Sequence, residues 1–216
     1  MDKRFMAIIA AIIAVIVGIA LFTGDSKDTG STSSAATNHT LGAGTSNITL
    51  VEYGDYQCPG CYSYYPILKQ VTEEYGDKIT FQFRNYPLTN IHPNAYAAAR
   101  AAEAASKQGK FWEMHDELYK SGNWTTWTAS SNSNPQPIFE GYAKAIGLNI
   151  DKYKNDFKSS TVNSAIRADM SAGEKAGVDS TPTFILDGKK VQIANTFEAF
   201  KTVIDEAIKN KENDKE

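Results

Sequence analysis

The order of strand and helix patterns constrains this chain of 216 residues most strongly. Residues 47–53 and 79–85 are rich in β-branched and aromatic residues, and a helical pattern over 62–75 separates them. A strand, a helix and a second strand in this order form a βαβ unit, whose strands pair in parallel through a right-handed crossover. The sequence therefore predicts an α/β domain whose sheet begins with this unit.

A block of helices is expected after the βαβ unit, because no strand pattern occurs between residues 85 and 182. A strand pattern returns at 182–186, and Asp187-Gly188 then predicts a hairpin turn into a strand at 189–193. The expected helices cover 93–107, 110–120, 137–146, 150–157, 161–175 and 196–209, with a polar loop at 122–136.

An uncharged apolar run occupies residues 5–22, which as a helix would span about 27 Å, close to the thickness of a bilayer core. Lys3 and Arg4 precede the run, so the positive-inside rule places residues 1–4 in the cytoplasm and the rest of the chain outside. The apolar core of a cleaved signal peptide is shorter, about 7–15 residues. We therefore favour a single-pass anchor in the cell membrane over a cleaved signal peptide.

Residues 23–46 are rich in Ser, Thr and Gly, and Leu41 is their only large aliphatic residue. Such a composition buries too little apolar surface to offset the entropy lost on ordering. We expect a disordered linker here, followed by one folded domain over 47–216 with a helical insertion at about 90–176. The net charge of −3 provides no basic surface, so nucleic-acid binding is not expected.

The two cysteines of the chain, Cys58 and Cys61, lie three residues apart, a spacing that chance gives about once in a hundred. A metal site would need two further ligands, and the three histidines show no paired spacing, so no metal is expected. A structural disulfide is possible in an oxidising compartment, although a loop this short constrains the unfolded chain little. The third interpretation, a dithiol that cycles between oxidation states, is the one we favour.

The position of Cys58 supports cycling. It follows a strand and a turn and begins a helix, with Pro59 suited to the first helical position. Unpaired N–H groups and the positive end of the helix dipole stabilise a thiolate there. Cys61 lies one turn later and is expected to face inward. Cys58 should therefore take part in the mixed disulfide, and Cys61 should resolve it.

Several segments together resemble the DsbA-like thiol:disulfide oxidoreductases of the thioredoxin superfamily. These segments are Glu52-Tyr53-Gly54-Asp55-Tyr56, Cys58-Pro59-Gly60-Cys61, Pro66, the run Lys110-Phe111-Trp112-Glu113-Met114-His115-Asp116, and Ser180-Thr181-Pro182-Thr183. The resemblance implies an α/β thioredoxin fold with a DsbA-type helical insertion. It also implies that Pro182 is cis and faces the cysteines, whereas the fragment alone would suggest a trans proline that begins a strand.

The resemblance assigns further roles near the cysteines. Glu52 matches a buried acid that passes protons to and from Cys61, although a solvent-facing glutamate at a sheet edge is the alternative. Thr181 can pair with an extended substrate by strand addition, and Pro59 and Gly60 complete the expected substrate contacts. Gly60 departs from the histidine that several strong oxidases of the family carry, so the sequence does not give the strength of oxidation.

The expected activity is the introduction of disulfide bonds into exported polypeptides, without a metal or an organic cofactor. A membrane quinone-linked thiol oxidase is the reoxidising partner that the resemblance implies, and a monomer is expected. Two alternatives stay open. One is an extracytoplasmic reductase or isomerase, and the other is a non-catalytic, membrane-tethered peptide-binding module with a static disulfide.

Overall fold

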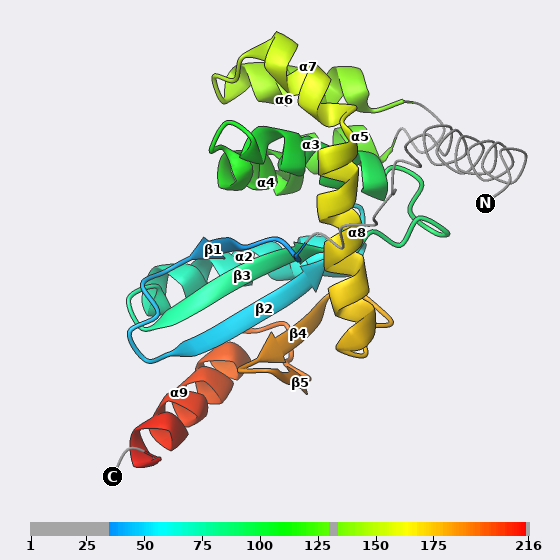
Figure 1. The fold of residues 1–216 in the computed structure, drawn as a ribbon. Helices are drawn as coiled ribbons and strands as arrows, with labels where there is room; N and C mark the ends of the chain where they lie inside the picture. Colours follow the sequence, from blue (N-terminus) through cyan, green and yellow to red (C-terminus); the bar gives the residue numbers. More distant parts are fainter. Residues whose placement is uncertain (1–34, 130–133, 215–216) are drawn as a thin grey trace, which may run out of the picture. The chain divides into compact units, whose positions relative to one another are not determined.

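A five-stranded mixed sheet organises the described residues, 35–129 and 134–214, of the computed structural model (Figure 1). The strand order is β1-β3-β2-β4-β5, and the central pair, β2 and β3, is parallel as the βαβ pattern predicts. The other three pairings are antiparallel. The strands are β1 (His39–Leu41), β2 (Ile48–Gly54), β3 (Ile79–Asn85), β4 (Thr183–Leu186) and β5 (Lys189–Val191).

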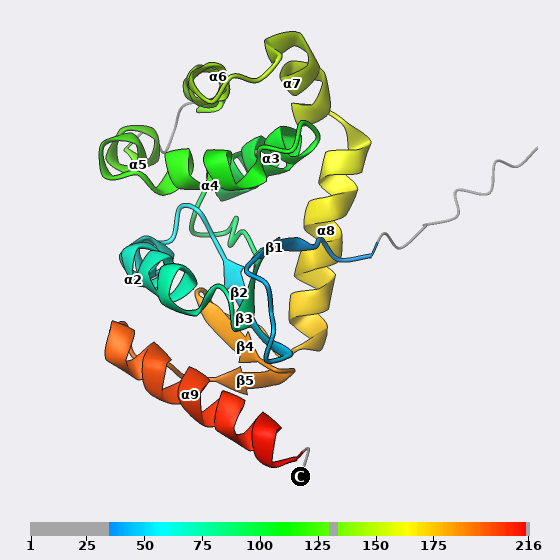
Figure 2. The ribbon, with the colours of Figure 1, turned by 90° about the vertical axis from the view of Figure 1, so that its left-hand side faces the viewer.

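Helices cover both faces of this sheet. Figure 2 shows α2 and α9 against one face, α8 along the other, and the block α3–α7 above the sheet. The block and α8 correspond to the helical insertion expected at about 90–176. The helices are α2 (Pro59–Tyr75), α3 (Ala95–Ser106), α4 (Phe111–Tyr119), α5 (Ser121–Thr128), α6 (Gln136–Ala145), α7 (Ile150–Phe157), α8 (Ser160–Lys175) and α9 (Phe197–Asn213).

The central strand β2 decides which face Glu52 occupies. Alternate side chains of a strand point to opposite faces, so Glu52 shares a face with Ile48 and Leu50. Those two residues pack with Leu68 and Val71 of α2, and Glu52 itself is only 2% exposed. Glu52 is therefore buried between the sheet and the helix that carries the cysteines, and the solvent-facing alternative is wrong.

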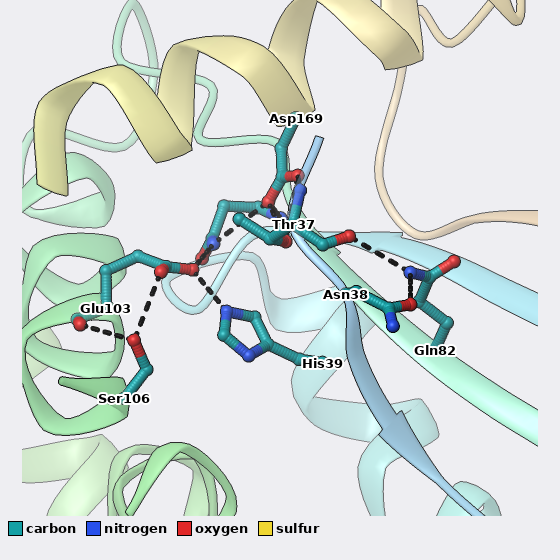
Figure 3. Close-up of polar contacts among 8 residues, drawn as sticks. Thr37, Asn38, His39, Gln82, Glu103, Ser106 and Asp169 are labelled. Carbon is teal, nitrogen blue, oxygen red and sulfur yellow. Dashed lines mark hydrogen bonds and ion pairs between the residues drawn. The ribbon is translucent and has the colours of Figure 1, made fainter. Parts of the chain in front are cut away.

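The segment 35–46, which the composition assigns to a disordered linker, is part of the folded domain. β1 pairs with the edge of the sheet, with His39 opposite Phe83 and Leu41 opposite Phe81. Figure 3 shows the polar contacts that hold this segment: Thr37 against Asp169, and His39 against Glu103. The linker prediction was wrong for these residues because polar bonds, and not apolar burial, order them.

Two buried carboxylates make these bonds. Asp169 of α8 accepts hydrogen bonds from the Thr37 N–H (2.7 Å) and from the Asn85 N–H (3.0 Å). Glu103 of α3 contacts His39 Nε2 at 2.8 Å and accepts from Asn85 Nδ2 at 2.8 Å. Buried polar groups are costly unless they are paired, and here the N-terminal segment supplies part of the pairing.

Helix α5 occupies the first part, up to Thr128, of the polar loop that the sequence predicts at 122–136, and residues 130–133 lie outside the described residues. Its hydroxyl groups bond to carbonyls within the helix, as Thr126 does to Gly122 O at 2.7 Å, and so they do not compete with the helical backbone. Trp127 is fully buried, with its ring centroid 5.4 Å from that of Phe139. The tertiary burial of Trp127 therefore overrides a sequence that has weak helix propensity.

The predicted membrane anchor at 5–22 and the linker residues 23–34 lie outside the described residues. Within the described ranges, no helix has both the length and the apolar character needed to span a bilayer.

Replacing Asp169 with alanine should destabilise the domain. The change leaves the buried Asn85 N–H and the partly buried Thr37 N–H without an acceptor, at a cost of about 1–3 kcal/mol for the buried group and less for the other. We expect a lower urea midpoint, together with faster hydrogen exchange of the β1 amides. Asp169→Asn, which keeps one acceptor oxygen, should lose less. The exposed Asp179→Ala serves as the control, and equal midpoints for all the variants would refute the assigned role of Asp169.

Candidate active site

Cys58 is the N-cap residue of α2, as the sequence predicts. Its backbone is extended (φ −70°, ψ 123°), and Pro59 follows at the start of the helix. The Cys58 N–H donates to Asp55 O at 3.0 Å, which closes the turn between β2 and α2. Cys58 is 8% exposed, and Cys61 is 1% exposed. Both cysteines are free thiols in this structure.

The loop before β4 lies against Cys58. The Thr181–Pro182 peptide bond is cis, as the resemblance predicted, and Cys58 Sγ lies 3.3 Å from Thr181 O. Gly60 of α2 lies close to both Cys58 and the proline loop. A Cβ added to it would lie 3.2 Å from Pro182 Cδ and 3.4 Å from Cys58 Sγ. Glycine at this position therefore permits the close approach of α2 to the proline loop.

The surroundings of Cys58 favour its thiolate. A hydrogen bond from the Cys61 thiol is the largest cause of a Cys58 pKa lowered from 9.0 to about 5. Partial burial opposes this shift, and hydrogen bonds from Thr181 and from the N–H groups of Gly60 and Cys61 add to it. Cys58 is therefore ionised at neutral pH.

Cys61 behaves in the opposite way. Burial raises its pKa well above the usual range, and its hydrogen bond to Cys58 raises the pKa further. The Asp55 N–H donates to Cys61 Sγ at 3.4 Å. Two cysteines one helical turn apart thus differ in charge at neutral pH: an ionised outer sulfur and a protonated inner one.

Glu52 lies beneath this pair. Burial raises the pKa of its carboxyl group from 4.5 to about 8, and repulsion from the Cys58 thiolate adds to the shift. A group with a pKa near neutral can both accept and donate a proton at physiological pH. The charge of Glu52 also raises the pKa of Cys61, so the two groups influence each other.

The Asp55 carboxylate holds the turn before Cys58, a role that the sequence analysis missed. It is fully buried and accepts from the Gln57 N–H and the Leu88 N–H, each at 2.8 Å, and it lies 2.8 Å from His92 Nδ1. The available clue was Asp55 itself, an acidic residue among the tyrosines that directly precede Cys58.

The aromatic residues near the site divide into core and surface. Tyr62 and Trp124 stack with a centroid distance of 4.2 Å, and both are partly exposed. The Trp124 indole N–H donates to Tyr56 O at 2.8 Å, which ties α5 to the turn before the cysteines. Tyr56 and Trp127 are buried in the core.

The remaining site predictions concern exposure. Pro59 is exposed, and Gly60, Thr181 and Pro182 are partly exposed beside Cys58. These four residues form one surface around the outer sulfur.

Across 35–129 and 134–214, no group of three or more His, Cys, Asp or Glu side chains is arranged to hold a metal ion.

The low pKa of Cys58 predicts its reactivity. Alkylation of reduced protein by iodoacetamide should occur at Cys58 and should rise with pH around a midpoint near 5, because only the thiolate reacts. Cys61→Ala should move this midpoint upward, since the largest source of thiolate stabilisation is lost. The measurement is the rate of carbamidomethylation by mass spectrometry, and a wild-type midpoint near 9 would show that Cys58 is an ordinary thiol.

The raised pKa of Glu52 predicts that this residue lowers the free energy of unfolding by an amount that depends on pH. Between about pH 4.5 and 8 the unfolded chain ionises this carboxyl group and the folded chain does not, so folding stability falls as pH rises through that window. Glu52→Gln removes this loss. Urea unfolding of the reduced proteins should show Glu52→Gln gaining stability over wild type from pH 4 to pH 8. A constant difference across that range would contradict the assigned pKa.

Comparison with known proteins places this geometry in a family. The family model described as thioredoxin matches residues 34–206. The Na⁺/H⁺ antiporter NhaA 1 of Mycobacterium sp. (strain KMS) is 36% identical over 155 residues, which cover 71% of this chain and 24% of that protein. NhaA 1 of Salinispora arenicola (strain CNS-205) is 31% identical over 171 residues, 79% of this chain and 25% of that one. The chain thus spans about a quarter of the length of these curated relatives.

Solved structures share the fold at lower identity. Oxidised BdbD from Bacillus subtilis has a TM-score of 0.66 at 22% identity, covering 81% of this chain and 97% of its own. α-DsbA1 from Wolbachia pipientis has a TM-score of 0.69 at 20% identity, covering 83% and 95%. A thioredoxin-like oxidoreductase from Silicibacter pomeroyi DSS-3 has a TM-score of 0.66 at 24% identity, covering 80% and 92%. The fold and the family model agree, and the chain belongs to the thioredoxin family.

Proposed function

We propose that this protein is a thiol:disulfide oxidoreductase that introduces disulfide bonds into exported polypeptides. One observation carries the proposal: an ionised, partly accessible Cys58 lies against the cis-Pro182 loop, with a protonated and buried Cys61 one turn behind it. This arrangement separates the two roles that disulfide exchange requires, a sulfur that meets the substrate and a sulfur that resolves the intermediate.

In the oxidising direction the reaction begins from the Cys58–Cys61 disulfide. A substrate thiolate attacks Cys58 Sγ, the disulfide breaks, and Cys61 leaves as a thiolate that takes up a proton. The second substrate thiolate then attacks the substrate sulfur of the mixed disulfide, and Cys58 leaves as a thiolate. The substrate gains one disulfide, and the protein gains two electrons as the reduced pair.

The pKa of Cys58 supports net oxidation. A stabilised Cys58 thiolate favours the reduced form of the protein, and this makes the disulfide a better oxidant. Gly60 contributes no side chain to this stabilisation, so it comes from Cys61, Thr181 and the backbone N–H groups at the start of α2. Reduction or isomerisation of substrate disulfides is the competing direction of the same chemistry.

Glu52 supplies the proton of the inner sulfur in this proposal. Cys61 takes up a proton when it leaves and must lose one when it attacks. Glu52 is buried under the same end of α2, and its pKa near 8 suits both transfers.

Thr181, Pro59 and Gly60 form the substrate contact in this proposal. Thr181 directly precedes the cis proline and lies against Cys58, so an extended peptide beside it would bring its own cysteine to that sulfur. Backbone pairing of this kind does not depend on the substrate sequence, which suits a catalyst of many polypeptides.

The cell membrane is the proposed location, with residues 1–4 in the cytoplasm and the catalytic domain outside. The apolar run 5–22 and the preceding Lys3 and Arg4 support this orientation. The proposed reoxidant is a membrane quinone-linked thiol oxidase, since a reduced pair must return its electrons to an acceptor.

The curated relatives are named for antiport. This chain matches only about a quarter of their length, so antiport is not part of the proposal.

Trapping tests whether the pair cycles. Cys61→Ser should accumulate Cys58-linked polypeptides on a non-reducing gel, because the mixed disulfide cannot be resolved. Cys58→Ser should show none. A double variant, Cys58→Ser with Cys61→Ser, that keeps full function would support the non-catalytic peptide-binding module instead.

The direction of exchange needs a second measurement. The oxidised wild-type chain should convert a reduced dithiol peptide to its disulfide, and Cys58→Ser should lose this activity. Equilibration with glutathione gives the potential, which we expect on the oxidising side of the thioredoxin value of about −270 mV. A value at or below that of thioredoxin would replace the oxidase by a reductase.

A further inference from the structure

A cavity extends from the inner cysteine to the surface between α2, α4 and the sheet. Its volume is about 180 Å³, far above the roughly 10–15 Å³ that one water molecule requires. Glu52 and Cys61 line its buried end, and the exposed residues Leu41 and Lys69 line its other end. Cys58 is not among the residues of its wall. The inner sulfur and the outer sulfur therefore reach solvent by different routes.

His115 of α4 lies in the wall of this cavity. Its side chain is 6% exposed, and neither ring nitrogen has a hydrogen-bond partner among the described residues. Its closest charged neighbour is the Asp116 carboxylate, with 3.5 Å between His115 Nδ1 and Asp116 Oδ1. A buried imidazole with no hydrogen bond at Nε2 and only a long contact at Nδ1 is costly unless something else satisfies it. The cavity supplies the space for water to do so.

Aromatic rings surround His115, so the cavity is the place where its ring nitrogens can meet water. Their centroids lie between 4.9 and 6.2 Å from that of the imidazole. These rings belong to Tyr56, Tyr65, Phe83, Phe111, Trp112 and Tyr119. An apolar aromatic side chain would fill this space equally well. The presence of a titratable imidazole therefore needs a chemical explanation.

The proposed exchange reaction requires protons to move to and from Cys61, which lines this cavity. Each cycle transfers one proton to Cys61 and one proton from it, and Glu52 is the adjacent acid. Glu52 is itself only 2% exposed, so its proton must reach solvent through another group or through water. The cavity that Glu52 lines is also lined by His115 and by the more exposed Asp116 and Lys69.

We propose that His115 is the relay through which Glu52 exchanges its proton with solvent along this cavity. The inference rests on the proposed function and adds a residue to it. In a mixed disulfide Cys58 no longer carries the thiolate charge that helps to raise the pKa of Glu52, so Glu52 can ionise and accept a proton. When Cys61 attacks this mixed disulfide, its proton passes to the Glu52 carboxylate, a Cys61–Cys58 bond forms, and the partner sulfur leaves with the electron pair. Glu52 passes the proton through cavity water to His115, and the imidazolium releases it to solvent beside Asp116.

The charges that face His115 suit this role. Burial lowers the pKa of His115, and Asp116 raises it in opposition, while Lys69 and His39 lower it. The imidazole is therefore neutral at pH 7, with one nitrogen that donates and one that accepts. The titratable and charged groups packed around it are Asp116 and Tyr119 on α4, Tyr65 and Lys69 on α2, Glu52 on β2, His39 on β1, and Tyr56 and Cys61 near the site.

The test separates the two cysteine steps. The reduced full chain is mixed with oxidised glutathione, and acid-quenched samples are analysed by mass spectrometry between pH 5 and 9. Formation of the Cys58–glutathione disulfide reports on Cys58, and its conversion to Cys58–Cys61 reports on Cys61. In His115→Gln we expect the first rate to stay within twofold of wild type. The second rate should fall at least tenfold, since a general acid–base group contributes about 10²–10⁴-fold and cavity water replaces part of the relay.

Two controls distinguish a relay from packing. Trp112→Phe changes an aromatic residue of the same cavity wall without removing a titratable group, and it should leave both rates near wild type. His115→Ala opens space beside the cavity, and added imidazole should restore its second rate. Conversion at the wild-type rate in His115→Gln, or a loss that Trp112→Phe shares and imidazole does not restore, overturns the relay.

A second variant avoids any change in the core. Asp116 is 45% exposed at its side chain, so Asp116→Asn should fold, and it removes a charge that raises the pKa of His115. The pH profile of the second rate should then shift to lower pH, with the Cys58 step unchanged. An unshifted profile contradicts the proposal. Because the assay uses only a small disulfide, it reports on His115 even if the chain does not act on polypeptides.

Discussion

The unequal burial of two sulfurs on one helical turn is the constraint on which this site depends. Cys58 caps α2 beside the exposed Pro59, whereas Cys61 faces the core with 1% of its surface exposed. Burial penalises a charge, so the inner sulfur keeps its proton and donates a hydrogen bond to the outer one. The same hydrogen bond therefore lowers the pKa of Cys58 and raises the pKa of Cys61.

The remaining parts of the site preserve this inequality. The Asp55 carboxylate fixes the turn that presents Cys58, and the Thr181–Pro182 loop closes over the outer sulfur. Gly60 allows the helix and the loop to approach. Glu52 comes from the opposite side, from the sheet, and ends beneath the inner sulfur. The outer sulfur thus meets the proline loop and the inner sulfur meets Glu52, so the two cysteines have different surroundings on opposite sides of one helical turn.

Much of the fold follows from local patterns. The apolar alternation of β2 and β3 and the helical period between them fix a parallel pair and a crossover. Asp187 and Gly188 adopt positive φ angles of 48° and 83°, as a two-residue hairpin requires. Local patterns failed where order came from distant partners. Thr37 is held by Asp169, 132 residues away, and α5 is held by the burial of Trp127.

The sequence by itself determined the cysteine pair, its place at a helix start, the candidate proline at 182 and the family resemblance, because each is a matter of spacing along the chain. Only the tertiary structure decided that Glu52 is buried, that Asp55 anchors the turn, and that a cavity joins Cys61 to His115. The physical reason is that these properties depend on which side chains meet across the sheet and between helices. A local pattern gives the direction of a side chain relative to its neighbours in the chain, whereas burial, charge and access are set by residues far away in the sequence.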